Sequence, residues 1–303
     1  MVLERKVLGL KFKNPILPAS GTFNMGREVA EFYELATFGG LITKGVTRAK
    51  RQGNVAPRTV ETVGGMLNSV GLQNPGVDAF IKNDLPFMKK QGVPVIANAC
   101  GTTIEDYVYV ASQLDKSNVD AIELNISCPN LGKSCGGMSF GVDPEMTKEV
   151  VSAVRKVTKK PLIVKLTPNV TNIAVIAKAA ESAGADAISL INTLAAMAVD
   201  IKTRKPILGN KVGGLSGPAV KPVALKMTWD VFNAVKIPVI GCGGISDYRD
   251  VIEFMLCGAT LVQVGTGLLT DPMCVPKMVA DLEKWCRENK INSLDEIVGG
   301  LKV

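Results

Sequence analysis

The chain has 303 residues, of which 47% are hydrophobic and 21% are charged, so it is long enough and apolar enough to fold around a large core. Its formal charge is +7, but no block of five or more like charges occurs, which argues against a nucleic-acid-binding tail. The seven cysteines include no Cys-x-x-Cys pair, so no zinc or iron–sulfur site is indicated.

The cysteine usage and the N-terminal residues favour a reducing, cytoplasmic location. Scattered thiols without a paired pattern are typical of that compartment. Charges interrupt the start of the chain, unlike the apolar core of a secretory signal. The longest apolar stretch, residues 187–199, contains polar side chains and is too short to span a bilayer.

In chain order, a short hairpin at residues 7–12 comes first, and we expect it to plug the floor of the fold. Eight apolar runs follow, as expected for parallel strands that are buried on both faces. The eight candidate strands are residues 14–20, 39–46, 94–100, 121–128, 161–167, 187–193, 238–244 and 261–267.

Amphipathic segments separate these strands. Residues 144–158 have helical spacing with Asp143 as a candidate N-cap. Residues 174–183 form a second candidate helix, which Gly184 would end. Alternating strands and helices without a linker predict a single (β/α)8 barrel domain over residues 1–303. An open doubly wound sheet is the rival fold, but the dinucleotide-binding glycine turn that it would carry is missing.

Three long connections follow strand ends, at residues 47–75, 129–142 and 194–216. In a barrel, the carboxyl ends of all strands and the loops after them lie on one face, where active sites are built. The chain is therefore predicted to be an enzyme. It has no histidine, so proton transfer near neutral pH would rely on other titratable side chains.

Glycines mark the ends of the last two strands, in Gly241-Cys-Gly-Gly-Ile245 and Gly265-Thr-Gly267. Loops at these two positions of a barrel commonly bind phosphate, because glycine lets backbone N–H groups approach the anion. The alternative is a pair of tight turns. The pattern does not choose between FMN and another phosphorylated ligand.

Two lysines stand at the ends of apolar strands, Lys44 and Lys165. A lysine in such a place is costly to bury unless it meets an anion, although it can also extend to the barrel mouth. Lys165 could stabilise the negative charge of a reduced flavin. Four asparagines repeat this placement and suit a ring of C=O and N–H groups: Asn68, Asn98, Asn125 and Asn192.

Cys128 gives the sharpest signal, because it follows a strand and precedes a proline in Asn125-Ile-Ser-Cys-Pro-Asn130. This position places its thiol at the barrel mouth. Nearby cations would favour the reactive thiolate. The alternative is a buried structural cysteine, the usual fate of this residue.

Taken together, these segments resemble the dihydroorotate dehydrogenase family. The resemblance extends over essentially the whole chain, and its motifs occur in the family's order. The two most specific are ELNISCPN at residues 123–130 and MLNSVGLQNPG at residues 66–76. The others are LITKGVT at 41–47, INTL at 191–194, GGLSGPAVKP at 213–222, GCGGI at 241–245 and VGTG at 264–267.

The resemblance implies oxidation of dihydroorotate to orotate in pyrimidine biosynthesis, with FMN bound to the barrel and no metal. It implies that Cys128 is the catalytic base, which removes the C5 proton while a hydride leaves C6. The implied substrate-binding residues are Lys44, Asn68, Ser69, Val70, Gly71, Leu72, Asn125, Asn192 and Thr193. The implied flavin-binding residues are Ser20, Lys44, Gly45, Asn98, Asn125, Lys165, Ile191, Gly217, Gly243, Gly244, Gly265 and Thr266.

The resemblance also indicates a subclass. Membrane-attached, quinone-linked relatives use a serine base and an extra N-terminal segment, whereas this sequence has Cys128 and begins at its first hairpin. The GLQNPG segment resembles the NAD-linked type more than the fumarate-linked homodimer. We therefore expect a homodimer core that joins a second subunit with FAD and a [2Fe–2S] cluster, giving a heterotetramer.

Three alternatives remain open at this stage. One is the fumarate-linked form of the same enzyme. Another is a flavin barrel that acts on RNA, like the dihydrouridine synthases, although no RNA-binding domain or basic stripe is visible. The third is a barrel that binds a sugar phosphate without redox chemistry. Cys135, in the loop after Cys128, is interpreted as a non-catalytic thiol.

Overall fold

The computed structural model describes residues 2–128 and 137–302, and its centre is a parallel barrel. The strands follow the order β3-β16-β15-β10-β9-β8-β7-β4 around the barrel. A hydrogen bond of 2.9 Å from Gly39 N–H to the Ile16 carbonyl joins the two end strands. The strands are β3 (Ile16–Pro18), β4 (Leu41–Ile42), β7 (Val95–Ala99), β8 (Ala121–Asn125), β9 (Leu162–Lys165), β10 (Ala187–Leu190), β15 (Val239–Cys242) and β16 (Ala259–Val264). The predicted (β/α)8 architecture is confirmed.

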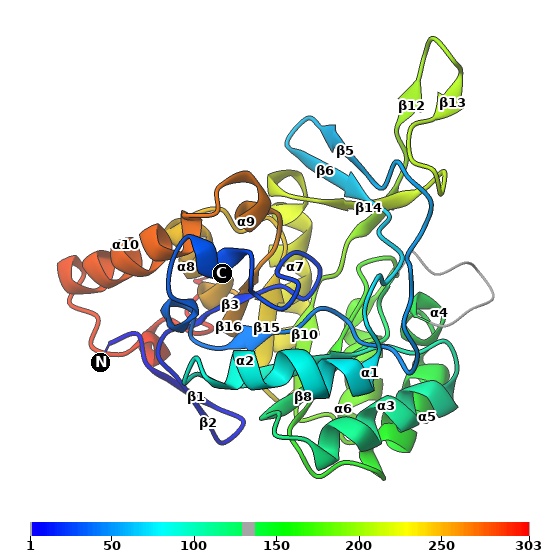
Figure 1. Cartoon of the computed structure of the whole chain (residues 1–303). Coiled ribbons are helices and arrows are strands. Elements are labelled where there is room, and N and C mark those ends of the chain that lie inside the picture. The colour runs from blue at the N-terminus through cyan, green and yellow to red at the C-terminus, as the bar shows by residue number, and fades with distance from the viewer. Residues whose placement is uncertain (1, 129–136, 303) are drawn as a thin grey trace.

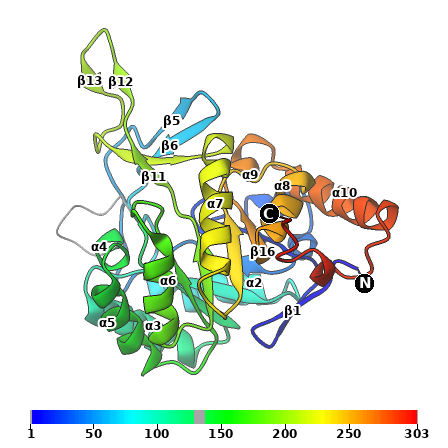
Figure 2. The ribbon, with the colours of Figure 1, turned by 180° about the vertical axis from the view of Figure 1, so that it is seen from behind.

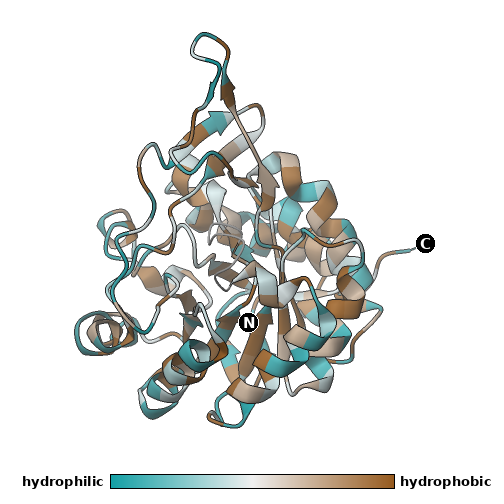
Figure 3. Ribbon diagram, turned by 90° about the vertical axis from the view of Figure 1, so that its right-hand side faces the viewer, coloured by the Kyte–Doolittle hydropathy of each residue, from teal (hydrophilic) through white to brown (hydrophobic). Residues whose placement is uncertain are grey.

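Helices surround the barrel (Figure 2), with their apolar sides turned toward the strands (Figure 3). The main helices are α2 (Leu85–Lys89), α3 (Ile104–Lys116), α5 (Pro144–Arg155), α6 (Ile173–Ser182), α7 (Lys221–Phe232), α8 (Tyr248–Leu256) and α10 (Cys274–Glu288). Short turns complete the set: η1 (Val29–Glu31), η2 (Leu35–Thr37), α1 (Val77–Ala79), η3 (Phe80–Asp84), α4 (Met138–Gly141), η4 (Pro218–Val220), α9 (Thr266–Thr270) and η5 (Leu294–Glu296).

The local signals at the helix ends are confirmed. The Asp143 side chain accepts hydrogen bonds from the backbone N–H groups of Glu145 and Met146 at the start of α5. Gly184, at φ +100°, follows the last turn of α6. No helix among the described residues is long and apolar enough to cross a membrane.

The N-terminal hairpin closes the floor of the barrel, as predicted. It consists of β1 (Arg5–Val7) and β2 (Leu10–Phe12). Val7 and Phe12 pack with the first inward-facing residues of the barrel strands, including Leu17 and Ile240. The buried Arg5 guanidinium donates to Asp295 at 2.6 Å, which ties this hairpin to the C-terminal region. This apolar packing fills the floor of the barrel between the described residues.

Two of the three long connections predicted at the opposite face build a second sheet, and most of the third, residues 129–142, lies outside the described residues. The order of this sheet is β11-β14-β6-β5, from β5 (Thr59–Thr62), β6 (Gly65–Asn68), β11 (Leu194–Ala196) and β14 (Gly213–Ser216). Beyond it, β12 (Val199–Asp200) and β13 (Lys205–Pro206) form a hairpin that projects from the barrel (Figure 1). Two segments about 150 residues apart in the chain therefore roof the barrel mouth.

Candidate functional site

A pocket that is partly open to solvent lies between the barrel mouth and this sheet. It is concave and lined by apolar and polar side chains, as small-molecule sites are. Strand ends β3, β8, β9, β10, β15 and β16 supply its floor, and β6 and β14 supply its roof. Predicted residues that line it are Ser20, Lys44, Gly45, Asn68, Val70, Gly71, Leu72, Asn125, Cys128, Lys165, Ile191, Asn192, Thr193, Gly217, Gly243, Gly244, Gly265 and Thr266.

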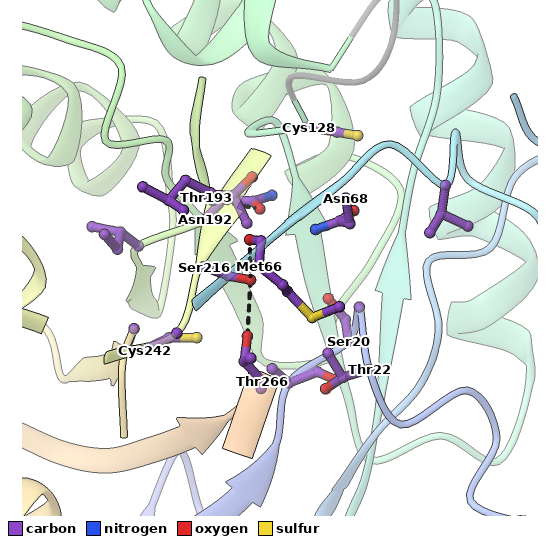
Figure 4. Close-up of a pocket in the computed structure, with 18 of the residues that line it drawn as sticks. Ser20, Thr22, Met66, Asn68, Cys128, Asn192, Thr193, Ser216, Cys242 and Thr266 are labelled. Atoms are coloured by element: carbon purple, nitrogen blue, oxygen red, sulfur yellow. Dashed lines mark hydrogen bonds between the residues drawn. The ribbon is translucent and has the colours of Figure 1, made fainter. Parts of the chain in front are cut away.

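Glycines form one end of this pocket. Gly243 and Gly244 follow β15 with φ of +132° and +75°, which side-chain-bearing residues rarely adopt. A Cβ on Gly244 would lie only 2.7 Å from the Cβ of Lys221. Beside them, the Thr266 hydroxyl donates to the Ser216 hydroxyl at 2.8 Å (Figure 4). Backbone and hydroxyl groups that line this end of the pocket are of the kind that binds phosphate, so the sequence prediction stays open here.

The two predicted lysines both reach the pocket. Lys165 is 3% exposed, and its ammonium donates to the Gln263 side-chain oxygen. The Lys44 ammonium donates to the Gly21 carbonyl at 3.2 Å. Burial lowers the pKa of Lys44, and the thiols of Cys128 and Cys100 oppose this shift. An anionic ligand would relieve the burial cost of both ammonium groups.

The asparagine amides are held in fixed directions. Asn192 Nδ2 donates to the Ser127 hydroxyl at 2.9 Å, and that hydroxyl donates to Asn125 Oδ1 at 2.9 Å. Asn68 ends β6 in the roof and lies opposite Asn192 and Thr193 across the pocket (Figure 4). Amides thus meet the pocket from its floor and its roof, which suits a ring with alternating donors and acceptors.

Cys128 lies at the edge of the pocket just beyond β8 (Figure 4). It is 7% exposed and packs with Leu72 and Cys100. Burial raises the pKa of Cys100 well above its usual value and also raises that of Cys242, a second thiol in the pocket lining. These two thiols are therefore largely protonated at neutral pH, and Cys100 does not line the pocket. Cys128 remains the candidate base because of its place in the pocket lining. Cys135 lies outside the described residues.

Two predicted residues do not line the pocket. Asn98 is fully buried beneath it and donates through Nδ2 to Glu123 Oε1 at 2.6 Å. Ser69 is also fully buried, and its hydroxyl accepts a hydrogen bond of 2.9 Å from Asn54. Neither side chain therefore reaches the pocket. Asn98 Oδ1 accepts a hydrogen bond of 3.1 Å from Asn125 Nδ2, and Asn125 lines the pocket.

Several lining residues were missed by the sequence analysis. Met66 and Ser216 are paired across β6 and β14, and the Met66 side chain extends toward Ser20 and Thr22 (Figure 4). Both residues lie in motifs named above, but nothing local in the sequence shows that the two segments pair across 150 residues. The missed lining residues are Ala19, Gly21, Thr22, Thr59, Met66, Leu215, Ser216, Val220, Cys242 and Leu269.

The fold and the pocket define a barrel enzyme whose strand ends bring a thiol, two lysines and a glycine-rich segment to one pocket. A family model described as dihydroorotate dehydrogenase matches residues 2–285. The chain belongs to the dihydroorotate dehydrogenase family. The resemblance drawn from its motifs is confirmed.

Three similar proteins from this family share one name. One from Thermoanaerobacter pseudethanolicus is 51% identical over 303 residues, covering 100% of both chains. Another, from Alkaliphilus oremlandii, is 53% identical over 295 residues and 97% of each chain. A third, from Caldicellulosiruptor saccharolyticus, is 49% identical over 303 residues and 100% of each. All three are named dihydroorotate dehydrogenase B (NAD(+)), catalytic subunit.

Proposed function

We propose that this chain oxidises (S)-dihydroorotate to orotate in pyrimidine biosynthesis and that the electrons pass to NAD⁺. The observation that carries the proposal is the meeting of Cys128, Lys44 and Lys165 in one pocket with a glycine cradle. Its support is full-length similarity to catalytic subunits named as NAD⁺-linked. That similarity favours this reading over the fumarate-linked enzyme, the RNA-modifying barrel and the sugar-phosphate barrel.

FMN fits the pocket. The positive-φ backbone of Gly243 and Gly244, together with Gly265 and Thr266, would hold its phosphate. Lys165 would face the flavin ring and stabilise its negative charge after reduction. When bound, FMN supplies the acceptor for two electrons. The other residues proposed to contact it are Ser20, Lys44, Gly45, Asn125, Ile191 and Gly217, and Asn98 would act on it through Asn125.

The proposed reaction forms the C5–C6 double bond of orotate. Cys128 removes the C5 hydrogen as a proton, and the C6 hydrogen leaves with its electron pair as a hydride. Lys44 would pair with the substrate carboxylate, while Asn125 and Asn192 would bind the ring amides. The roof covers part of the mouth and would limit the access of water, which would strengthen each of these interactions. Asn68, Val70, Gly71, Leu72 and Thr193 complete the proposed substrate site, and Ser69 is buried behind it.

The acceptor side requires a partner. We propose that two copies of this chain form a core that joins a subunit with FAD and a [2Fe–2S] cluster, which would pass the electrons to NAD⁺. Among the described residues, no group of three or more metal-ligating side chains of the His, Cys, Asp or Glu type comes together.

Purification tests this proposal. The protein is expected to carry flavin absorbance, with FMN released on denaturation, and anaerobic dihydroorotate should bleach it. NAD⁺ should be reduced only when the partner subunit is added. A colourless protein that binds no FMN would contradict the proposal. Direct reoxidation by fumarate, without a partner, would instead assign the fumarate-linked class.

A further inference from the structure

A carboxylate with no assigned role lies directly beneath the pocket. Glu123, in the middle of β8, is 0% exposed and accepts three hydrogen bonds. Asn98 Nδ2 donates to its Oε1 at 2.6 Å, and the Ser189 hydroxyl donates to its Oε2 at 2.9 Å. The Gln263 amide also donates to Oε2. A buried carboxylate is costly, so one that only accepts from fixed donors constrains those donors.

One arm of this network leads to Lys165. Because Gln263 turns its N–H toward Glu123, its side-chain oxygen faces the other way and accepts from the Lys165 ammonium. The negative carboxylate and the positive ammonium are thus joined through a single amide. If the carboxylate did not fix this amide, Gln263 could present its N–H to the ammonium, and the contact would be repulsive.

The second arm leads to the substrate side. Asn98 donates to Glu123, so its oxygen is left to accept from Asn125 Nδ2 at 3.1 Å. Asn125 then accepts from the Ser127 hydroxyl, which accepts from Asn192 Nδ2 at 2.9 Å. Each donor direction depends on the one before it. Asn125 and Asn192 both line the pocket.

We propose that Glu123 is a positioning residue that sets the hydrogen-bond direction of both arms, and thereby holds Lys165 on the flavin side and Asn125 and Asn192 on the substrate side. This inference rests on the proposed function. Glu123 itself does not line the pocket. Its effect is exerted through Gln263 and Asn98.

Glu123→Gln tests the idea, because the two ways in which Glu123 could act on FMN have opposite signs. If Glu123 acted only through its own charge, the neutral variant would make FMN easier to reduce. If Glu123 acts through Gln263 and Lys165, the variant makes FMN harder to reduce. We expect a roughly tenfold less favourable two-electron reduction equilibrium, which corresponds to a potential lower by about 30 mV. We also expect a several-fold higher KM for dihydroorotate.

Gln263→Met separates the arms and serves if Glu123→Gln does not fold. It should lower the potential to a similar extent but leave the KM within about twofold. In the double variant, Glu123→Gln should lower the potential no further, because its path to Lys165 is already cut. Thr228→Val is the matched control. It removes a fully buried hydroxyl that donates to Ala224 in α7, outside this network, and should leave the potential unchanged.

An unchanged or higher potential in Glu123→Gln, or additive effects in the double variant, would overturn the proposal. Failure of the proposed function looks different: the wild-type flavin would not be reduced by dihydroorotate. In that case crystals of the flavin-free wild type and Glu123→Gln decide the matter. Displacement of the Lys165 ammonium from Gln263 supports the positioning role, and an unchanged contact refutes it.

Discussion

Lys44→Met isolates the contribution of one desolvated ammonium to anion binding. The Lys44 ammonium lines the pocket and donates to the Gly21 carbonyl, which carries no net charge. The substrate carboxylate would therefore supply the missing counter-charge. A hydrogen bond to a charged group contributes about 1.5–3 kcal/mol. Its loss should weaken the binding of orotate, the anionic product, roughly 10- to 150-fold.

The pH dependence follows from the lowered pKa of Lys44. Burial penalises its charged form, so in the ligand-free protein the penalty is present at neutral pH and is relieved as pH rises through the lowered pKa. Lys44→Met removes that penalty, so the ligand-free variant should unfold at a temperature no lower than wild type. A bound anion raises the pKa again. The wild-type affinity for orotate should therefore fall as pH rises, and this fall should begin at a pH below 10.5, the ordinary pKa of a lysine.

The assay is a titration of the flavin spectrum with orotate at several pH values. Lys50→Met is the matched control, because it removes the same charge from an exposed side chain in the neighbouring cleft. Its orotate affinity should change by less than about threefold, the effect of a screened surface charge. If Lys44→Met binds orotate as tightly as Lys50→Met does, the assignment of Lys44 to the anion is refuted.

Two further substitutions test the frame of the pocket. Gly244→Ala should weaken FMN binding at least tenfold, since its Cβ would meet Lys221. Gly92→Ala is the control: Gly92 has a similar φ of +70° but open space around it, so this variant has only the backbone cost of about 1–2 kcal/mol. Equal FMN affinities of the two variants would contradict the prediction. Tyr107→Phe leaves the buried Asn125 carbonyl without its 2.8 Å donor, so it should lower the free energy of unfolding by about 1–3 kcal/mol. Denaturant titration measures this loss, and an unchanged value would show that another donor replaces the hydroxyl.

The barrel was predictable because its signals are local. Continuous apolar runs marked the buried parallel strands, and Asp143 and Gly184 marked helix ends through their own backbone chemistry. The strand bounds were less accurate. The run at residues 39–46 contains only β4 at Leu41–Ile42, because the chain turns toward the pocket after that point.

The pocket floor was predictable for the same reason, since a polar residue at the carboxyl end of an apolar barrel strand lies at the face where the active site is built. The roof was not. Met66 pairs with Ser216 by strand register, and register across 150 residues leaves no trace in a single sequence. Glu123 was read only as part of a motif, because its three donors come from β7, β10 and β16.

The role of Cys128 is best tested by anaerobic, single-turnover mixing of dihydroorotate with the FMN-loaded Cys128→Ser variant near neutral pH, beside the wild type. A serine hydroxyl is the poorer base, so flavin reduction should slow at least a hundredfold while orotate binding is retained. Reduction at close to the wild-type rate would remove Cys128 from its role as the base and contradict the assignment of this pocket.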